Sequence, residues 1–532
     1  MKKKLHILFL LLFAVLLYLP LSLWVLRAGT GRLFDVKLEG FTDDTPRPAL
    51  SLQQMASGEF QAQAASWVGE KVPLRGVYTK TYNTLQYGCF QQGNGIIGKN
   101  HSVFEQTYLY EYFSMGDRYD FSLPERAAKM DDIVAHMVSA NKKLEAVGKH
   151  LYVYLAPGKA ELCPEDIPAN YVPMSNPDSP SALERMTALL KETEIPCLFC
   201  EDLVDDLEYP AFYPTGIHWS RTFEQKVSQR LIADFSALTG KSYKSFEFTG
   251  VEQSDTPFWR DSDVYDLLNI WMPPKAKYYQ YKTEPTAPQD AQSLRIILWG
   301  DSYGDGLRYD LADEGFEKNI IYINRDDYVQ MSRDLSQIPL GDDWTNLDWQ
   351  ACLDVSDIVV LEMVAPEIGN DTYGFIQALD AYLDTYVPQE ALSYYPTAWD
   401  ASVTAYINFY SGLWGGEVGF SWTKDRCHID LNSREISQKG LEIAYEVPYA
   451  TAQSDGGDTV TVSVNGTVLS EKTYSEGMED TLVFSPENLP ADEDGLYRIV
   501  TSCSKTFNPK KMGLYEDPRD VGILLTYVGG AR

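Results

Sequence analysis

The sequence predicts an α/β protein with a parallel sheet covered by helices, followed by an antiparallel β-sandwich and preceded by a single transmembrane helix. Three observations support this prediction. Short apolar runs alternate with helical patterns between residues 124 and 386, β-rich runs follow residue 396, and residues 5–25 form an almost unbroken apolar stretch. We therefore expect an anchor over 1–31, an α/β domain over 32–396 and a β-sandwich over 397–532.

The composition is that of a folded protein with a strongly acidic surface. The chain has 532 residues, of which 44% are hydrophobic, and its 76 acidic against 45 basic residues give a net charge of -31. Such a charge repels a polyphosphate backbone, so nucleic acid is excluded as a partner. The seven cysteines are odd in number and irregularly spaced. They indicate neither a disulfide framework nor a metal site, and no cofactor is expected.

The N-terminal apolar run is long enough to cross a membrane. Its 21 residues, Leu5 to Val25, at about 1.5 Å each match a hydrocarbon core of about 30 Å. The alternative is a cleaved signal peptide, but the run is too long for one and the cleavage pattern is poor. Three lysines, Lys2 to Lys4, favour a cytoplasmic N-terminus. We expect a single-pass cell-membrane protein with the rest of the chain outside the cytoplasm.

Five apolar runs alternate with helical patterns in the α/β region. The helical pattern after Pro124 ends at Gly148 and is followed by the first run. The runs are LYVYLA at 151–156, CLFCE at 197–201, LRIILWG at 294–300, IIYIN at 320–324 and DIVVLEMV at 357–364. They predict parallel strands buried on both faces. The segment from about residue 250 to residue 290 interrupts the alternation of strands and helices and is interpreted as a long insertion.

The region after Pro396 is β-rich. Runs such as DTVTVSVNGTVL and LYRIVTSCSKTF alternate and are separated by Gly, Pro, Asn and Asp. Asn465 and Gly466 form the two-residue signal of a β-hairpin. These patterns predict the antiparallel sandwich.

The third of these apolar runs, LRIILWG, is followed two positions later by a serine. In parallel α/β sheets, ligands bind at the carboxyl ends of the strands, where Gly300, Asp301 and Ser302 would lie. A glycine at the strand exit lets the serine project from the loop beside backbone N–H groups that can stabilise an oxyanion. The alternative is a turn serine that caps the next helix. The position after a buried strand, with Gly304 and Gly306 following, favours a nucleophile.

A nucleophilic serine needs a base, and one of the six histidines fits. His218 lies in FYPTGIHWSRTF, between the second strand and a helix, which again places it at the carboxyl edge. The other five lie at the membrane end, in an early turn, on or after a helix, or in the β-rich tail: His6, His101, His136, His150 and His428. The alternative is a histidine packed beside Trp219.

Four motifs together resemble a known family. The segments IIGKNHSVFE, LYVYLAPGKAELCPEDIP, HWS and GDSY occur in the order seen in the alginate O-acetyltransferase (AlgX/AlgJ-like) family, over roughly residues 50–390. The resemblance implies an SGNH-hydrolase-like (flavodoxin-like) domain, circularly permuted so that the histidine precedes the serine. It implies Ser302 as nucleophile and His218 as general base.

The chain departs from that family at the acid that orients the histidine. The family has an acidic residue two positions before the histidine, where this chain has Gly216. Three outcomes stay open: another acid replaces it, the Thr215 hydroxyl or a backbone carbonyl orients His218 more weakly, or the domain is inactive. The candidate acids are Asp301, Asp305 and the pair Asp205 and Asp206. Glu362, on the fifth strand, resembles the family's Glu-bearing strand but receives no firm role.

Further candidates surround the predicted pair. Gly300 and Gly304 are candidates for stabilising the oxyanion, and Trp219 and Tyr303 are candidates for substrate binding. Lys159 matches a family lysine after the first strand and is either a substrate contact or a solvated loop cation.

The resemblance implies an extracytoplasmic O-acetyltransferase. Its acyl-serine would pass an acetyl group to hydroxyls of a cell-surface or secreted polysaccharide, and a membrane-bound O-acyltransferase partner would supply the acyl group. The β-sandwich would help to hold the glycan. Four aromatics are candidates for this contact, although most aromatics of a sandwich belong to its core: Tyr410, Trp414, Trp422 and Tyr474. The alternatives are a carbohydrate esterase and a catalytically impaired glycan-binding or assembly protein.

Overall fold

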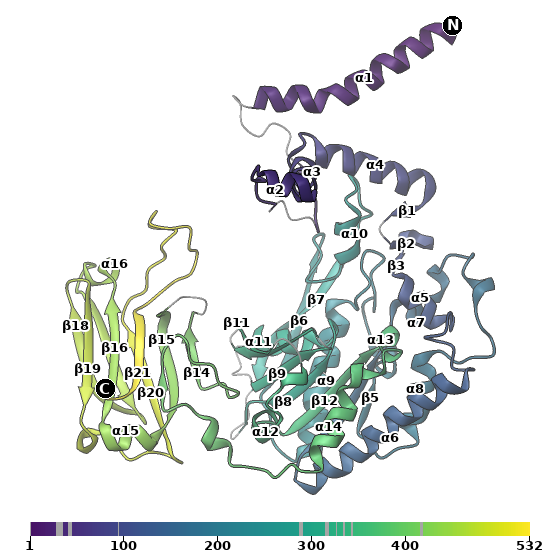
Figure 1. The fold of residues 1–532 in the computed structure, drawn as a ribbon. Coiled ribbons are helices and arrows are strands. Elements are labelled where there is room, and N and C mark those ends of the chain that lie inside the picture. The colour runs from purple at the N-terminus through teal and green to yellow at the C-terminus, as the bar shows by residue number, and fades with distance from the viewer. Residues whose placement is uncertain are drawn as a thin grey trace.

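The structure is a computed structural model that describes residues 2–532 except 28–35, 41–44, 94, 287–290, 314–318, 326, 334–335, 342–343 and 415–418. Figure 1 shows a group of N-terminal helices, an α/β domain and a C-terminal β-rich part. The expected domain boundary near residue 31 and the expected end of the insertion near residue 290 lie outside the described residues.

The N-terminal part is helical. The apolar run forms α1 (Lys2–Arg27), and α2 (Leu52–Ser57), α3 (Glu59–Lys71) and α4 (Arg75–Phe90) follow. Within the described residues, none of the helices combines the length and the hydropathy that a membrane span requires, so the expected transmembrane helix is not supported. A small antiparallel sheet comes next: β1 (Gln92–Gly93), β2 (Gly95–Ile97) and β3 (Val103–Phe104).

The central sheet has seven strands in the order β11-β10-β9-β8-β12-β4-β5. The five predicted strands are confirmed and run parallel: β4 (His150–Ala156), β5 (Cys197–Phe199), β8 (Arg295–Gly300), β9 (Asn319–Asn324) and β12 (Ile358–Val364). Two antiparallel strands at one end of the sheet, β10 (Tyr328–Arg333) and β11 (Ser336–Gly341), were not predicted, because they lack the continuous apolar runs of the parallel strands.

Helices cover both faces of this sheet, as predicted. Along β4, Leu151 and Val153 enter one buried cluster, whereas Tyr152 and Tyr154 enter another. The first cluster packs beneath α6 (Pro124–Ala146), α8 (Ala182–Lys191) and α14 (Phe375–Leu383), and the second beneath α9 (Arg221–Thr239). The shorter helices are α5 (Gln106–Tyr112), α7 (Lys159–Leu162), α11 (Asp305–Asp313), α12 (Trp349–Asp354) and α13 (Ala365–Ile368).

The insertion is a long β-hairpin whose distal part returns to the sheet edge. Its strands, β6 (Ser245–Ser254) and β7 (Tyr278–Thr286), pair antiparallel, and α10 (Asp263–Leu268) lies between them in the chain. Gln225 of α9 fixes the hairpin, because its amide accepts from the Tyr281 N–H at 2.8 Å and donates to the Tyr281 carbonyl at 3.0 Å. The segment between the strands is thereby tied to the domain that it interrupts.

The C-terminal part is one curled antiparallel sheet, whereas a two-sheet sandwich was expected. The order is β18-β17-β20-β15-β21-β16-β19, with β13 on β21 and β14 on β15. The two halves are continuous because the 12-residue β15 pairs with β21 at its start and with β20 along the rest. The predicted hairpin is confirmed: Asn465 and Gly466 connect β17 and β18 with φ of 45° and 75°.

The C-terminal elements have the following bounds: β13 (Ala398–Trp399), β14 (Tyr410–Leu413), β15 (Ser421–Asn432), α15 (Ser433–Lys439), β16 (Leu441–Val447), α16 (Tyr449–Ala452), β17 (Asp458–Val464), β18 (Thr467–Tyr474), β19 (Met478–Phe484), β20 (Leu496–Cys503) and β21 (Leu524–Gly530).

Candidate active site

Three side chains from distant parts of the chain form a hydrogen-bonded row. The Ser302 Oγ lies 2.7 Å from the His218 Nε2, and the His218 Nδ1 lies 2.5 Å from the Asp263 Oδ2. An ionised carboxylate only accepts hydrogen bonds, so the Nδ1 carries the proton and the Nε2 accepts from the serine hydroxyl. This arrangement of nucleophile, base and orienting acid is that of a Ser-His-Asp triad.

The turn after β8 holds Ser302 in place. The Glu362 carboxyl lies beneath the turn, where the Asp301 N–H donates to its Oε2 at 2.7 Å, and a Cβ at Gly300 would come within 2.5 Å of the same oxygen. The Tyr303 N–H donates to the Asp301 side chain at 2.8 Å and the Gly304 N–H donates to the Asp301 carbonyl at 3.0 Å. The N–H groups of Asp301, Tyr303 and Gly304 are thus occupied, whereas the Ser302 N–H has no acceptor among the described residues. Gly304 therefore does not serve as an oxyanion donor.

A buried lysine holds the loop before His218. The Lys159 Nζ donates to the carbonyls of Tyr213 at 2.7 Å, Pro214 at 3.1 Å and Gly216 at 2.8 Å. Its side chain is 1% exposed, and burial lowers its pKa to about 7. Lys159 is therefore part of the support of the loop, whereas the sequence suggested a substrate contact or a solvated cation.

Asp263 occupies the space that a side chain at position 216 would need. A Cβ on Gly216 would lie 2.9 Å from the Asp263 Oδ1 and 3.0 Å from the carbonyl oxygens of Arg260 and Asp261. The Oδ1 also accepts from the Ile217 N–H at 3.1 Å, which ties the acid to the histidine loop. Asp263 of the insertion thus takes the place of the missing acid of the family motif. Its position leaves no room for a side chain at residue 216.

The acids and the hydroxyl proposed from sequence do not contact His218. Asp301 is part of the Ser302 turn, Asp305 pairs with Arg260 at 2.6 Å and Arg308 at 2.5 Å, and the Thr215 Oγ1 donates to the Asp261 carbonyl at 2.7 Å. Asp205 and Asp206 lie in the short helix Cys200–Asp206. Asp263 was missed because it belongs to the region interpreted as an insertion, 45 positions after His218.

The two aromatic candidates for substrate binding are buried. Trp219 is 4% exposed and its indole N–H donates to the Glu224 Oε2 at 3.3 Å. Tyr303 is 1% exposed, its hydroxyl donates to the Ile217 carbonyl at 2.8 Å, and its ring centre lies 5.0 Å from that of His218. Both side chains shape the wall behind His218, and neither is exposed to a substrate.

Acidic groups dominate the surroundings of the triad. Burial raises the pKa of Asp301 to about 6 and raises the pKa of Glu362 well above its usual value, which the nearby Asp301 reinforces. Burial also raises the pKa of Glu105, which directly follows β3. The Arg260 guanidinium balances these charges, since it donates to the Ser302 carbonyl oxygen as well as to Asp305.

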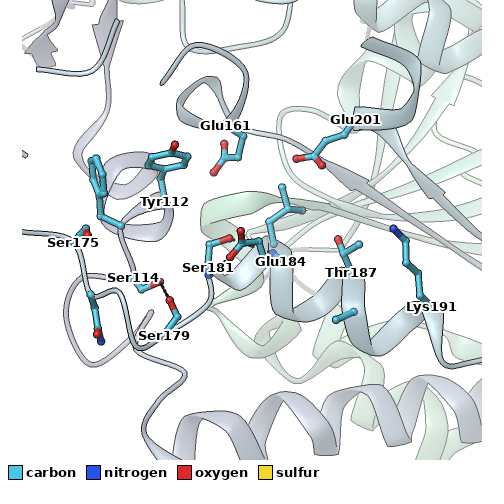
Figure 2. Close-up of a pocket in the computed structure, with 14 residues that line it drawn as sticks. Tyr112, Ser114, Glu161, Ser175, Ser179, Ser181, Glu184, Thr187, Lys191 and Glu201 are labelled. Atoms are coloured by element: carbon cyan, nitrogen blue, oxygen red, sulfur yellow. Dashed lines mark hydrogen bonds between the residues drawn. The ribbon is translucent and has the colours of Figure 1, made fainter. Parts of the chain in front are cut away.

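A separate pocket of about 710 Å³ lies near α5, α7 and α8 and contains none of the triad residues. Figure 2 shows Glu161 and Glu201 at one side of it and Lys191 at the end of α8. Both carboxyl oxygens of Glu161 are buried without a hydrogen-bond partner among the described residues. Burial raises the Glu161 pKa well above its usual value, and the adjacent Glu111 raises it further.

The candidate glycan contacts of the C-terminal sheet are partly or wholly covered. Tyr474 is 3% exposed, while Tyr410, Trp414 and Trp422 are half-buried. The ring of Trp414 has Lys424 at 5.1 Å and Arg519 at 5.9 Å from its centre. A role of this sheet in holding a glycan stays a prediction.

Comparisons with known proteins agree with the resemblance seen in the motifs. Residues 117–317 match the family model described as "ALGX: SGNH hydrolase-like domain, acetyltransferase AlgX". The predicted AlgX/AlgJ-like resemblance and the SGNH-hydrolase-like fold are thereby confirmed over this span. No curated protein matches the sequence.

Solved structures similar to this chain include the following three. The O-acetyltransferase domain of Pseudomonas putida AlgJ has a TM-score of 0.34 and 15% identity, covering 55% of this chain and 100% of its own. Pseudomonas aeruginosa AlgX has a TM-score of 0.33 and 13% identity, covering 82% and 90%. Bacillus cereus PatB1 has a TM-score of 0.29 and 9% identity, covering 46% and 92%.

Proposed function

We propose that this protein, whose residues 117–317 match the domain of the acetyltransferase AlgX, is an O-acyltransferase that passes an acetyl group through Ser302 to the hydroxyls of a polysaccharide. The observation that carries the proposal is the row of hydrogen bonds from Ser302 through His218 to Asp263. A neutral serine hydroxyl is a weak nucleophile, and this row supplies the base that activates it.

The first half-reaction acylates the serine. His218 takes the Ser302 proton on its Nε2 while the Oγ attacks the acyl carbonyl of the donor. The Asp263 carboxylate stabilises the imidazolium that forms, and the Ser302 N–H faces the oxyanion of the tetrahedral intermediate. His218 then gives its proton to the leaving group, whose bond to the acyl carbon breaks. The result is an acyl ester on Ser302.

The second half-reaction transfers the acyl group to the acceptor. A sugar hydroxyl gives its proton to the His218 Nε2 and attacks the ester carbon, and the Ser302 Oγ leaves and takes the proton back. Water in the place of the sugar would make the protein an esterase, since the same triad serves both reactions. The choice depends on which acceptor reaches the acyl-serine.

The position of Asp263 speaks against a catalytically impaired protein. The absence of an acid at Gly216 was the reason to consider one, and a carboxylate now lies 2.5 Å from the His218 Nδ1. A function outside the cytoplasm, with a polysaccharide acceptor and a membrane-bound acyl donor, is part of the proposal. It is supported by the resemblance to the AlgX/AlgJ-like family.

The proposal is tested with p-nitrophenyl acetate as donor, with and without oligosaccharides. We expect mass spectrometry to find an acetyl group on the Ser302 peptide, and this label to be lost in Ser302→Ala and His218→Ala. Ser437→Ala, an exposed serine on α15, is the control and should keep the label. An unlabelled Ser302 in the wild type would overturn the proposal. Acetate release that no sugar alters, with no acetylated sugar formed, would establish the esterase instead.

A further inference from the structure

We propose that Trp259 is a stacking platform for a sugar ring of the acceptor, beside the acyl-serine. This inference rests on the proposed function and names the part of the site that recognises the acceptor. Trp259 lies in the insertion, four positions before Asp263, and neither the motifs nor the triad involve it.

Trp259 is exposed close to residues that are buried. Its side chain is 47% exposed, whereas Asp261 is 1% and Ser262 is 7% exposed. Indole is among the largest apolar surfaces that a protein can present, and a ligand that covers it removes that surface from water. Two aromatics beside His218, Trp219 and Tyr303, are buried. Trp259 therefore offers an exposed aromatic surface at this site.

The backbone of Trp259 is in the left-handed region. Its φ is 45°, which bulky residues rarely adopt because the side chain crowds its own backbone. Such conformations persist where the surrounding structure enforces them, and they concentrate at ligand-binding and catalytic sites. The strain and the exposure together indicate a ligand contact.

One side chain separates the indole from the nucleophile. The Arg260 Cζ lies 5.1 Å from the centre of the Trp259 ring, and the same guanidinium donates to the Ser302 carbonyl oxygen and, at 2.6 Å, to the Asp305 Oδ2. A ring that stacks on Trp259 is thereby placed next to the turn that carries Ser302. In the proposal, its hydroxyls reach the acyl-serine and the His218 base.

The chemistry of this position fits a sugar. The C–H face of a pyranose ring packs against an indole, whose rigid surface loses little conformational entropy on binding. The Arg260 guanidinium is already engaged with Asp305 and Ser302, and Glu105 and Asp263 add negative charge nearby. Recognition by stacking needs no charge on the acceptor, so a neutral sugar ring is the expected occupant.

The test compares acylation with transfer in Trp259 variants. The burst of p-nitrophenol reports acylation of Ser302, and mass spectrometry of a panel of hexose, N-acetylhexosamine and uronate oligosaccharides reports transfer. We expect the ratio of transfer to acylation to fall at least about tenfold in Trp259→Ala, with a higher KM for the acceptor, and to stay within about threefold in Trp259→Phe, which keeps an aromatic face.

Trp271 provides the matched control. It lies on the same insertion, is 43% exposed and has the Lys80 Nζ 6.0 Å from its ring centre, but its indole N–H donates to Thr81 of α4. Trp271→Ala should therefore leave the transfer ratio unchanged.

Two outcomes would overturn the inference. If Trp259→Ala lowers acylation and transfer in equal proportion, Trp259 acts by holding Arg260 and the Ser302 turn, which is a positioning role. If wild-type protein forms acetyl-Ser302 but transfers to no member of the panel, the sugar platform is wrong while the acyl-enzyme stands. Failure of the proposed function itself differs from both, since Ser302 would not be acylated at all.

Discussion

At the scale of single residues, the carboxylate of Asp263 determines which tautomer His218 adopts. The carboxylate accepts from the Nδ1 at 2.5 Å, which leaves the Nε2 free to take the Ser302 proton. It also accepts from the Ile217 and Val264 N–H groups, at 3.1 and 2.9 Å, so its own position is fixed. The acid therefore orients the base without depending on the substrate.

The first prediction concerns this acid. Asp263→Asn can present an amide N–H to the Nδ1 and so favour the tautomer that cannot accept the serine proton. We expect kcat for p-nitrophenyl acetate to fall by up to about 10⁴, the loss seen for the same change in a serine protease, with little change in KM. Asp266→Asn, an exposed acid on the same helix, is the control and should stay within about twofold. A loss of less than tenfold in Asp263→Asn would remove Asp263 from the triad.

The second prediction concerns the buried Glu161 beside the pocket. Its folded-state pKa lies well above the usual 4.5, first because of burial and then because of Glu111. The folded chain thus holds the proton to a higher pH than the unfolded chain does. The contribution to stability is fully present below pH 4.5 and is lost as the pH rises through the folded-state pKa.

Glu161→Gln removes this titration while it keeps the shape of the side chain. We expect the variant to have a higher Tm than the wild type at pH 8, and the difference to vanish near pH 4.5. Glu165→Gln, an exposed neighbour, should show no such pH dependence. Parallel Tm curves for Glu161→Gln and wild type across pH 4.5–8 would contradict the prediction.

At the scale of elements, the histidine loop and the insertion form one unit. The Tyr265 N–H donates to the Thr215 carbonyl at 3.1 Å, the Thr215 hydroxyl donates to the Asp261 carbonyl, and the Ile217 N–H donates to Asp263. Lys159 holds the same loop from the sheet side through three carbonyls. The insertion is therefore part of the catalytic domain in its contacts, although it interrupts the strand and helix alternation of the sequence.

The third prediction follows from this unit. Gly216→Asp in the wild type forces a Cβ to within 2.9 Å of the Asp263 carboxylate, so we expect a loss of about 1–3 kcal/mol in stability and of most activity. In an Asp263→Ala background that carboxylate is gone, and the new acid should restore part of the lost activity. Equilibrium unfolding and ester hydrolysis of the four proteins form a double-mutant cycle.

The control for this cycle is Gly250→Asp on β6, where a Cβ meets nothing within 4 Å. It should change neither stability nor activity appreciably. Additive effects of the Gly216 and Asp263 substitutions would mean that the two positions do not share one space.

At the scale of the whole molecule, one buried cluster extends from the α/β domain into the C-terminal sheet. It contains side chains of α6, β12 and α14 together with side chains of β15, β16 and β17, and the segment between them contributes Ile407 and Phe409. Since these side chains share one core, we infer that the two parts unfold together.

The fourth prediction tests this coupling. Phe409 is 1% exposed, and Phe409→Ala should destabilise the protein by about 3–5 kcal/mol by leaving a cavity. We expect calorimetry to show a single transition that moves to lower temperature as a whole. Val468→Ala, at a residue that is 58% exposed on β18, should leave it in place. Two transitions, of which only one moves, would show that the parts unfold independently.

The sequence by itself determined the parallel strands and the placement of Ser302 and His218 at their carboxyl edge. A strand buried on both faces must be apolar along its whole length, and Ser302, which comes two positions after such a strand, must lie at the sheet edge. The place of His218 follows from the order of strand, loop and helix along the chain. The primed turn at Asn465 and Gly466 is likewise a local property, since it depends on two residues.

Only the tertiary structure decided the acid, the role of Lys159 and the form of the C-terminal sheet. The orienting acid has only to lie close to the imidazole in space, and any of the 76 acidic residues could do so. No spacing in the sequence identifies the residue that does. A buried lysine and a loop lysine look alike in sequence, because the difference lies in which carbonyls surround the Nζ. Whether the strands form two sheets or one curled sheet depends on how β15 divides its pairing between β20 and β21. Hydrogen bonds between strands that are distant in sequence leave no local pattern from which this could be predicted.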